Sequence, residues 1–460
     1  MKAANSVLKE TVEAIYRART PGSERLHEES SEVLPMGVSG AAKYYAPYPA
    51  FLERAEGGHV WDVDGNLYVD LLMGAGPNLL GHRPPSIIDA VRRQLDQATQ
   101  LLAPTRLELS LARRLQGHMP YLERIRFTNT GSEAVRTCLR AARAYSGRTG
   151  LAKLEGGFHG SDDPFLVSTG SVGGAAERPV PSPASAGVPG YVLEDVLVLP
   201  FDDVARSVEL VEERADRLAA VFLEPVAFST GGAIPVSADL ARALRQVTAR
   251  HGILLVFDEV VTCYRMGLGG GAAYLGVEPD LSAVGKAIGG GFPLAAMGGR
   301  AEVMDAVVGP RSAGEGRQVF QSGTYTGNPV SLAAGLAVLD VLEGEPVLER
   351  IDALAEQLRA GLRRVFRQHR IAAHVSGVGS VFQVHFAASQ PCNRRDILAG
   401  DLELTRLFLL GLVGEGVLWP PIHPGVTAYA HSDEDIHRVL EAADRVAGLF
   451  VAAGAGGGGR

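Results

Sequence analysis

The stretch Ile253-Leu-Leu-Val-Phe-Asp-Glu-Val260 decides the fold class. An apolar run that follows a helical pattern over residues 237–251 and ends in two acids is typical of a strand buried on both faces of a parallel sheet. Ligands of such sheets bind beyond the carboxyl ends of the strands, so Asp258 stands where a carboxylate would meet a ligand. From position alone, a helix N-cap or a surface acid is an equally good interpretation.

Similar apolar runs recur earlier in the chain, each separated from the next by a helical stretch. They cover residues 125–128, 196–199 and 219–223. Continuous apolar runs that alternate with helices predict an α/β domain with a mostly parallel sheet.

The two ends of the chain predict a second, α+β domain. Helical spacing over residues 7–16 is followed by two short strands that meet at Asp64-Gly65-Asn66, a sequence suited to a tight turn. Helices are expected over 329–342, over 347–368 and from 432 onward, with an alternating segment over 380–386. We therefore expect an N-terminal segment of the small domain over 1–75, a large domain over 76–330, a C-terminal α+β domain over 331–453, and a disordered tail over 454–460.

The composition limits the classes of function. A chain of 460 residues, 46% hydrophobic and 21% charged, is long enough for two domains with large cores. A net charge of -8 argues against a nucleic-acid partner. The three cysteines are far apart and form no CxxC pair, so we expect neither a disulfide framework nor a metal site. No signal-peptide pattern and no membrane-length apolar run are present, which predicts a cytoplasmic protein without a membrane partner.

A single lysine stands out in Val284-Gly-Lys-Ala287, where its neighbours are small or apolar. Desolvation would lower the pKa of Lys286 and make its amine a nucleophile toward aldehydes. The alternative is a surface lysine whose stem lies along apolar groups. A phosphate-loop interpretation fails because Asp280 and Ala287 occupy the positions that require Gly and Ser or Thr.

A third feature is the turn Thr128-Asn-Thr-Gly-Ser132, where a strand passes into a helix. The N–H groups and the dipole of a helix N-terminus bind phosphate, and Ser132 would add a hydroxyl donor. An ordinary capping box is the alternative.

In combination, these features resemble the class III aminotransferases, which depend on pyridoxal 5'-phosphate (PLP), and in particular the branch that contains glutamate-1-semialdehyde aminomutase. The resemblance implies a fold-type I PLP-dependent transferase, with a large, mostly parallel seven-stranded sheet domain and a smaller α+β domain from the N- and C-terminal segments. Seven motifs between about residues 34 and 444 carry it, in the family's order: Asn129-Thr-Gly-Ser-Glu-Ala134, Glu155-Gly-Gly-Phe-His-Gly160, Glu224-Pro225, Phe257-Asp-Glu-Val260, Gly285-Lys286, Gly289-Gly-Gly-Phe-Pro293 and Gly323-Thr-Tyr-Thr-Gly-Asn-Pro329.

The resemblance also implies roles around PLP. Lys286 would hold the cofactor as a Schiff base and carry protons, and Asp258 would pair with the ring nitrogen, which keeps the ring an electron sink. The phosphate would lie on Gly131 and Ser132. Phe158 and Val260 would cover the two faces of the ring.

Three further residues follow from the same motifs. Glu224 matches an acid near the cofactor or substrate, with a buried structural acid as the alternative. His159 is interpreted as structural or as a support behind the cofactor contacts. Thr324 matches a threonine that reaches the phosphate of the neighbouring subunit, which implies a homodimer with shared sites.

The substrate side departs from the aminomutase pattern. Gly74-Ala-Gly-Pro77 replaces a Ser-Trp-Gly-Pro run, so Ala75 would leave room for a bulkier, cyclic or aromatic substrate. Lys43 lies where relatives place a cation near a substrate carboxylate, although an ammonium lacks the bidentate geometry of arginine. The segment 160–191 resembles a mobile loop that covers the active site of this branch.

These observations predict an aminotransferase of a specialised biosynthetic pathway. It would move an amino group from a small-molecule donor, with glutamate as one candidate, to a carboxylated keto acceptor. The alternatives are an intramolecular aminomutase of the glutamate-1-semialdehyde type or an amino-acid epimerase, since all share the same proton-transfer steps. A non-catalytic PLP-binding protein would require a defect in the catalytic set, and Lys286 and Asp258 are both present.

Overall fold

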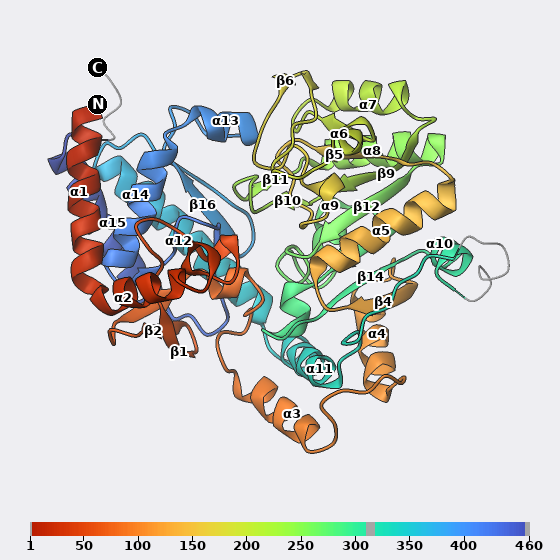
Figure 1. The fold of residues 1–460 in the computed structure, drawn as a ribbon, viewed down its shortest axis with the longest axis horizontal. Helices are drawn as coiled ribbons and strands as arrows, with labels where there is room; N and C mark the ends of the chain where they lie inside the picture. Colours follow the sequence, from red (N-terminus) through yellow and green to blue (C-terminus); the bar gives the residue numbers. More distant parts are fainter. Residues whose placement is uncertain (1, 310–317, 456–460) are drawn as a thin grey trace. The chain divides into compact units, whose positions relative to one another are not determined.

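The computed structural model describes residues 2–309 and 318–455, and the chain forms two compact units (Figure 1). The larger unit comprises Pro85–Leu348 and Cys392–Arg395. The smaller unit comprises the chain up to Pro84, Glu349–Pro391, and the chain from Asp396 onward.

A seven-stranded sheet, in the order β4-β14-β13-β12-β9-β5-β8, forms the centre of the larger unit. The five strands from β13 to β8 run parallel, whereas β14 is antiparallel to both of its neighbours, β13 and β4. This unit is therefore α/β with a mostly parallel seven-stranded sheet, which confirms the expected fold class. The strands are β4 (Arg124–Thr128), β5 (Gly150–Leu154), β8 (Val196–Leu199), β9 (Leu218–Leu223), β12 (Leu254–Glu259), β13 (Leu281–Val284) and β14 (Ala295–Gly299).

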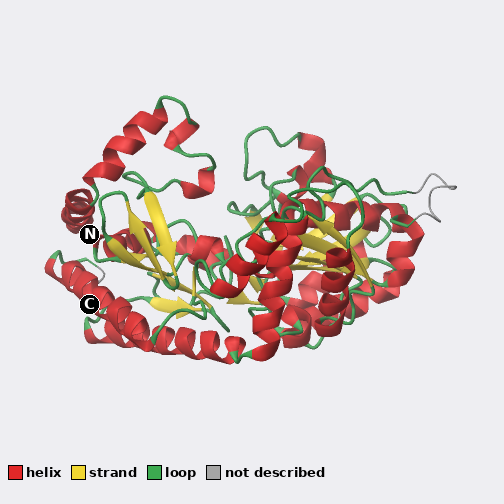
Figure 2. Ribbon diagram, turned by 90° about the horizontal axis from the view of Figure 1, so that it is seen from below, coloured by secondary structure: helices red, strands yellow, loops and turns green. Residues whose placement is uncertain are grey.

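Helices pack around this sheet because its strands are apolar on both faces; every residue of β9 and β12 is buried. Figure 2 shows the helices of this unit around its strands. Helix α5 (Gly131–Ser146) packs against five of the strands with its apolar stripe, and the Thr130 side chain caps its first turn. The other helices are α3 (Pro85–Leu95), α4 (Arg106–His118), α6 (Gly190–Glu194), α7 (Val204–Glu213), α8 (Ala238–His251), α9 (Gly270–Leu275), α10 (Ala301–Val307) and α11 (Pro329–Gly344), and the short pairs β6/β7 (Gly174–Ala175, Arg178–Pro179) and β10/β11 (Val226–Ala227, Ile234–Pro235) complete the unit.

The unit boundary after α11 differs from the domain boundary drawn at residue 330. Helix α11 packs against α3 and α4 and so belongs to the larger unit. The Arg114 guanidinium of α4 lies 2.6 Å from the Asp340 carboxylate and 3.0 Å from that of Glu343, both on α11. The packing partners of α11 are distant from it in sequence. The helical periodicity of α11 therefore could not show to which unit the helix belongs.

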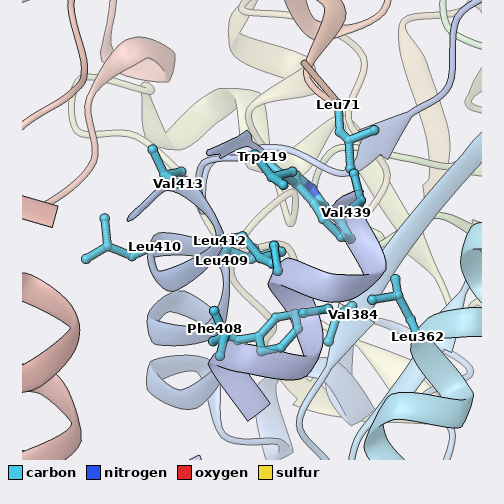
Figure 3. Packing of buried hydrophobic residues seen from close by; sticks show 14 of the residues in the cluster. Leu71, Leu362, Val384, Phe408, Leu409, Leu410, Leu412, Val413, Trp419 and Val439 are labelled. Carbon is cyan, nitrogen blue, oxygen red and sulfur yellow. The ribbon is translucent and has the colours of Figure 1, made fainter. Parts of the chain in front are cut away.

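The smaller unit is α+β. One sheet has the order β1-β2-β3-β17 and a second the order β15-β16-β18. Its apolar core gathers side chains from α14, α15, α12 and β16 together with Trp419 (Figure 3). The Trp419 ring meets Phe382 edge-on at 5.0 Å between centroids. Its elements are α1 (Lys2–Arg19), α2 (Pro21–Ser31), β1 (Leu52–Glu56), β2 (His59–Asp62), β3 (Leu67–Asp70), α12 (Val347–Gln368), β15 (His374–Ser376), β16 (Val381–His385), α13 (Arg394–Ala399), α14 (Leu402–Gly414), β17 (Val417–Leu418), β18 (Gly425–Val426) and α15 (Asp433–Ala452).

The prediction of a disordered tail over 454–460 is wrong for the first two residues of that range. Gly454 and Ala455 follow the end of α15, and the Ala455 N–H donates to the Phe450 carbonyl at 2.8 Å. Ala455 is buried in the core of the smaller unit. The remaining tail, 456–460, lies outside the described residues.

Two further findings concern the described residues as a whole. Within 2–309 and 318–455, no helix combines the length and apolarity required to cross a membrane. In the same residues, no group of three or more His, Cys, Asp and Glu is arranged to hold a metal ion.

Candidate active site

Asp258 and Lys286 lie at the ends of neighbouring parallel strands in the larger unit. In the register of β12 and β13, Asp258 is opposite Ala283, and Lys286 follows the end of β13 by two residues. Lys286 has a φ of 46°, a left-handed conformation that is strained for a residue with a side chain. Both residues line one cavity of about 290 Å³. The topology therefore brings the two residues singled out from the sequence to one site.

The other residues that line this cavity come mostly from the motifs quoted above. Apart from Thr324, every residue predicted to contact the cofactor lines this cavity. These eight residues are Gly131, Ser132, Phe158, His159, Glu224, Asp258, Val260 and Lys286.

Two hydrogen bonds hold the Asp258 carboxylate. Its Oδ1 accepts from the Val260 N–H at 3.1 Å, and its Oδ2 lies 3.0 Å from Nδ1 of His159. Burial lowers the pKa of His159, and the charge of Asp258 only partly opposes this effect. The imidazole is therefore neutral at physiological pH, and its Nδ1–H donates to the carboxylate.

The amine of Lys286 is suited to nucleophilic chemistry. The pKa of Lys286 is lowered to about 8, first by burial and then by the charge of the nearby Arg265, against the opposing charges of Asp258 and Glu224. A substantial fraction of the lysine is therefore neutral near pH 8, unlike an ordinary exposed lysine.

Glu224 lies directly after β9 and lines the same cavity. Burial, and secondly the charge of Asp258, raise the pKa of Glu224 to about 8. Its two oxygens accept from the N–H groups of Phe158, at 2.6 Å, and Phe228, at 3.3 Å. Glu224 thus both faces the cavity and holds part of its wall.

The N-terminus of α5 forms a tight cradle at the cavity wall. Gly160 has a φ of 95°, and a Cβ placed there would lie 2.5 Å from the Ser132 Oγ. A Cβ on Gly131 would lie 2.8 Å from the Val260 side chain. Small residues therefore keep this helix end open to the cavity, as an anion-binding site requires.

The chemistry of this site fits PLP. The helix N-terminus suits a phosphate, the Asp258 carboxylate suits a protonated ring nitrogen, and the Lys286 amine suits an aldehyde. Phe158, with 38% of its surface exposed, and Val260 add the apolar surface that a flat ring needs.

Three predicted residues lie elsewhere. Thr324 is exposed and is not among the cavity-lining residues; its carbonyl accepts from the Gln100 side chain. Lys43 and Ala75 belong to the smaller unit. Lys43 is exposed and donates to the Ser39 hydroxyl at 2.9 Å, and Ala75 has a φ of 66°. Their roles toward substrate or a neighbouring subunit remain predictions.

The structure adds residues that were not predicted. Ser229 lines the cavity, and Lys153 is fully buried beneath the loop that carries Phe158. Arg265 is also buried, and its charge acts on Lys286. A lysine in the middle of an apolar strand and an arginine shortly after Asp258 are signals that could have identified the latter two.

The loop after Gly160 is held at several points. Arg395 forms a bidentate ion pair with Glu155, at 2.6 and 2.9 Å, and donates to the Gly173 and Gly174 carbonyls. Arg394 donates to the Gly170 carbonyl. The segment predicted to be a mobile loop therefore has arginine contacts to its backbone.

Comparisons with known proteins agree with this site. The family described as Aminotransferase class-III matches residues 41–446. A glutamate-1-semialdehyde 2,1-aminomutase of Thermus thermophilus is 39% identical over 430 residues, which cover 92% of this chain and 98% of that protein. An omega-transaminase from Sphaerobacter thermophilus superimposes with a TM-score of 0.87 at 36% identity, over 94% of this chain and 97% of the other. A transaminase solved with PLP bound gives a TM-score of 0.86 at 31% identity, over 95% and 99%.

The match covers most of the chain and includes the motifs that line the cavity. Together with the chemistry of the site, it identifies pyridoxal 5'-phosphate as the cofactor. The chain belongs to the class-III aminotransferase family.

Proposed function

We propose that this enzyme moves amino groups on PLP, with Lys286 as the covalent anchor and proton carrier and Asp258 as the partner of the ring nitrogen. One observation carries the proposal: the Lys286 amine and the Asp258 carboxylate meet at one cavity from the ends of adjacent strands. When bound, PLP supplies an electron sink that stabilises negative charge on the substrate carbon.

The protein's own groups would provide the rest of the chemistry. With a pKa of about 8, Lys286 can both accept and return a proton near neutral pH. His159 keeps Asp258 in one orientation, and the N-terminus of α5 would bind the phosphate.

We further propose that transfer occurs between two molecules, from an amino donor to a carboxylated keto acceptor. This reaction is supported by the departures at Ala75 and Lys43 from the aminomutase pattern, and by the resemblance in structure to an omega-transaminase. Ala75, in place of a large aromatic residue, favours a bulky or cyclic acceptor.

An intramolecular aminomutase is the second candidate. The names of the curated relatives support this reaction better than they support an intermolecular aminotransferase, since the relatives at 37–39% identity are glutamate-1-semialdehyde 2,1-aminomutases. The epimerase alternative lacks a comparable observation.

A half-reaction distinguishes the two candidates. The PLP-loaded enzyme is incubated with single amino donors, including glutamate, without any acceptor, and the keto acid released per active site is measured. About one equivalent of keto acid, with conversion of the cofactor to its amine form, supports the aminotransferase. Isomerisation of glutamate-1-semialdehyde without release of a keto acid supports the aminomutase, and Lys286→Ala should abolish either activity.

We also propose a cytoplasmic homodimer in which Thr324 contributes to the neighbouring site. The exposed position of Thr324 and its absence from the cavity of its own chain are consistent with this role. Light scattering should give twice the chain mass, and Thr324→Ala should weaken PLP binding without dissociating the dimer.

A further inference from the structure

One peptide unit at the cavity wall is held at both ends by buried ionisable side chains. The Gly157 carbonyl accepts from the Lys153 Nζ at 2.8 Å, and the N–H of the next residue, Phe158, donates to Glu224 Oε1 at 2.6 Å. This carbonyl and this N–H belong to the same planar unit and point in opposite directions. The two contacts therefore fix the rotation of that plane about the chain.

The side chain of Lys153 is held in place by its surroundings. It lies in β5, is fully buried, and also contacts the Val167 carbonyl at 2.7 Å and the Thr169 hydroxyl at 3.4 Å. The Thr169 hydroxyl donates to the Phe165 carbonyl, so its oxygen can accept from the lysine. An ammonium group has three N–H donors and meets three oxygens here, whereas a neutral amine has two N–H donors for the same three oxygens.

Burying the charge of Lys153 costs free energy, and the groups around the ammonium offset this cost. Burial lowers the pKa of Lys153 to about 7, while the charges of Glu224 and Glu155 raise it. The two backbone N–H groups that donate to Glu224 partly oppose the rise in its pKa that burial causes. The three hydrogen bonds and the nearby acids therefore favour the ammonium form of Lys153.

The held peptide unit leads directly into two residues of the site. The Phe158 side chain is 38% exposed and lines the cavity, and the next residue, His159, contacts Asp258. A rotation of the peptide plane would therefore move both the Phe158 ring and the His159 imidazole.

We infer that Lys153 is a positioning residue for the cofactor, which acts with Glu224 by clamping the Gly157–Phe158 peptide unit and so sets the Phe158 ring against the PLP ring. This role rests on the proposed function, because it requires PLP in the cavity. Lys153 is not among the residues that line the cavity, so it acts through Phe158 and His159.

The test compares Lys153→Met with Leu151→Ala. Leu151 is fully buried two residues earlier in the same strand, so Leu151→Ala should lower the melting temperature without reaching the peptide unit. Cofactor-free protein is titrated with PLP, and the dissociation constant and the circular dichroism of the bound cofactor are measured. Lys153→Met should weaken PLP binding by about tenfold or more and alter the dichroism, because a hydrogen bond from a charged group is lost. Leu151→Ala should keep both within about twofold of wild type at a comparable loss of melting temperature.

A double-mutant cycle tests whether the effect passes through Phe158. The losses from Lys153→Met and Phe158→Leu should be non-additive, since both displace the same ring. If Lys153→Met does not fold, Lys153→Gln replaces it, because the amide retains N–H donors for the carbonyls, and a smaller weakening is expected.

The outcomes separate the two proposals. Wild-type affinity and dichroism in a folded Lys153 variant, or full additivity with Phe158→Leu, would overturn the clamp alone. If Leu151→Ala weakened PLP binding equally, Lys153 would have only a general stabilising role, and this result would also overturn the clamp. A wild-type protein that binds no PLP would overturn the proposed function and the clamp together.

Discussion

The imidazole of His159 donates to the carboxylate of Asp258 across 3.0 Å, and the imidazole makes T-shaped contacts with the rings of Phe165 and Phe222. A neutral donor at this position orients the carboxylate without neutralising its charge. The hydrogen bond therefore fixes the direction of the Asp258 carboxylate, which is what a partner of a protonated ring nitrogen requires.

Replacing His159 should lower turnover more than it lowers stability. His159→Leu removes the donor to Asp258, and a hydrogen bond to a charged group contributes about 1.5–3 kcal/mol. We expect kcat to fall roughly tenfold to a hundredfold. His159→Asn can place an amide N–H near the position of Nδ1 and should recover a large part of the loss. Equal kcat values for both variants would show that the hydrogen bond contributes nothing to turnover.

A methyl group at Gly160 should weaken cofactor binding. Gly160 has a φ of 95°, and a Cβ there would lie 2.5 Å from Ser132 Oγ at the start of α5. We expect Gly160→Ala to cost about 1–3 kcal/mol of stability and to raise the dissociation constant of PLP about tenfold or more. Thermal unfolding and PLP titration measure the two effects.

Gly147 provides the matched control for this substitution. It also has a left-handed backbone, with a φ of 71°, but a Cβ there would meet no atom within 4 Å. Gly147→Ala should therefore cost about 1 kcal/mol and leave PLP binding unchanged. A loss of PLP affinity in Gly147→Ala would show that backbone strain alone explains the effect at Gly160.

Much of the large domain could be predicted because its central strands are continuous apolar runs. The strands β8, β9 and β12 appear in the sequence as such runs, although β12 (Leu254–Glu259) continues through the two acids that were expected to follow it. The strands β5, β13 and β14 were missed, since Lys153 interrupts β5, β13 (Leu281–Val284) has only four residues, and β14 (Ala295–Gly299) consists mainly of small residues. Pairing across the sheet buries these three strands, and their own sequences do not show it.

The site could be predicted where its residues share short motifs, and not where it depends on backbone atoms. Asp258 lies in the last two residues of β12 and Lys286 follows the end of β13, and a residue at the end of an apolar run is a pattern that a sequence records. The contacts of Lys153 are mainly carbonyls of the loop over residues 157–167, and a carbonyl carries no sequence signal. Arg395 meets Glu155 from 240 residues away, so no local pattern could connect them.

Breaking the Arg395–Glu155 pair should loosen the loop over residues 170–175. The pair is bidentate and partly buried, and the same guanidinium donates to the Gly173 and Gly174 carbonyls. Arg395→Gln should cost about 1–3 kcal/mol and speed hydrogen exchange of the amides of this loop.

The exposed pair Arg178–Glu213 serves as the control, because Arg178 lies three residues beyond this loop. Its side chains are 61% and 41% exposed, so Arg178→Gln should change stability by less than about 1 kcal/mol. If both variants exchange at the same rate as wild type, the Arg395 contacts do not restrain the loop.

The pH dependence of PLP loading should report the lowered pKa of Lys286. Only the neutral amine attacks an aldehyde, and a pKa of about 8 makes roughly a tenth of the lysine neutral at pH 7 and roughly nine tenths at pH 9. The loading rate of the cofactor-free enzyme, measured by stopped-flow absorption, should therefore rise about tenfold between pH 7 and pH 9 and then level off. The rate of a free lysine side chain under the same conditions, divided by the fraction of that amine that is neutral at each pH, corrects for the titration of PLP itself. A corrected rate that still rises tenfold per pH unit above pH 9 would assign Lys286 an ordinary pKa and would contradict its desolvation.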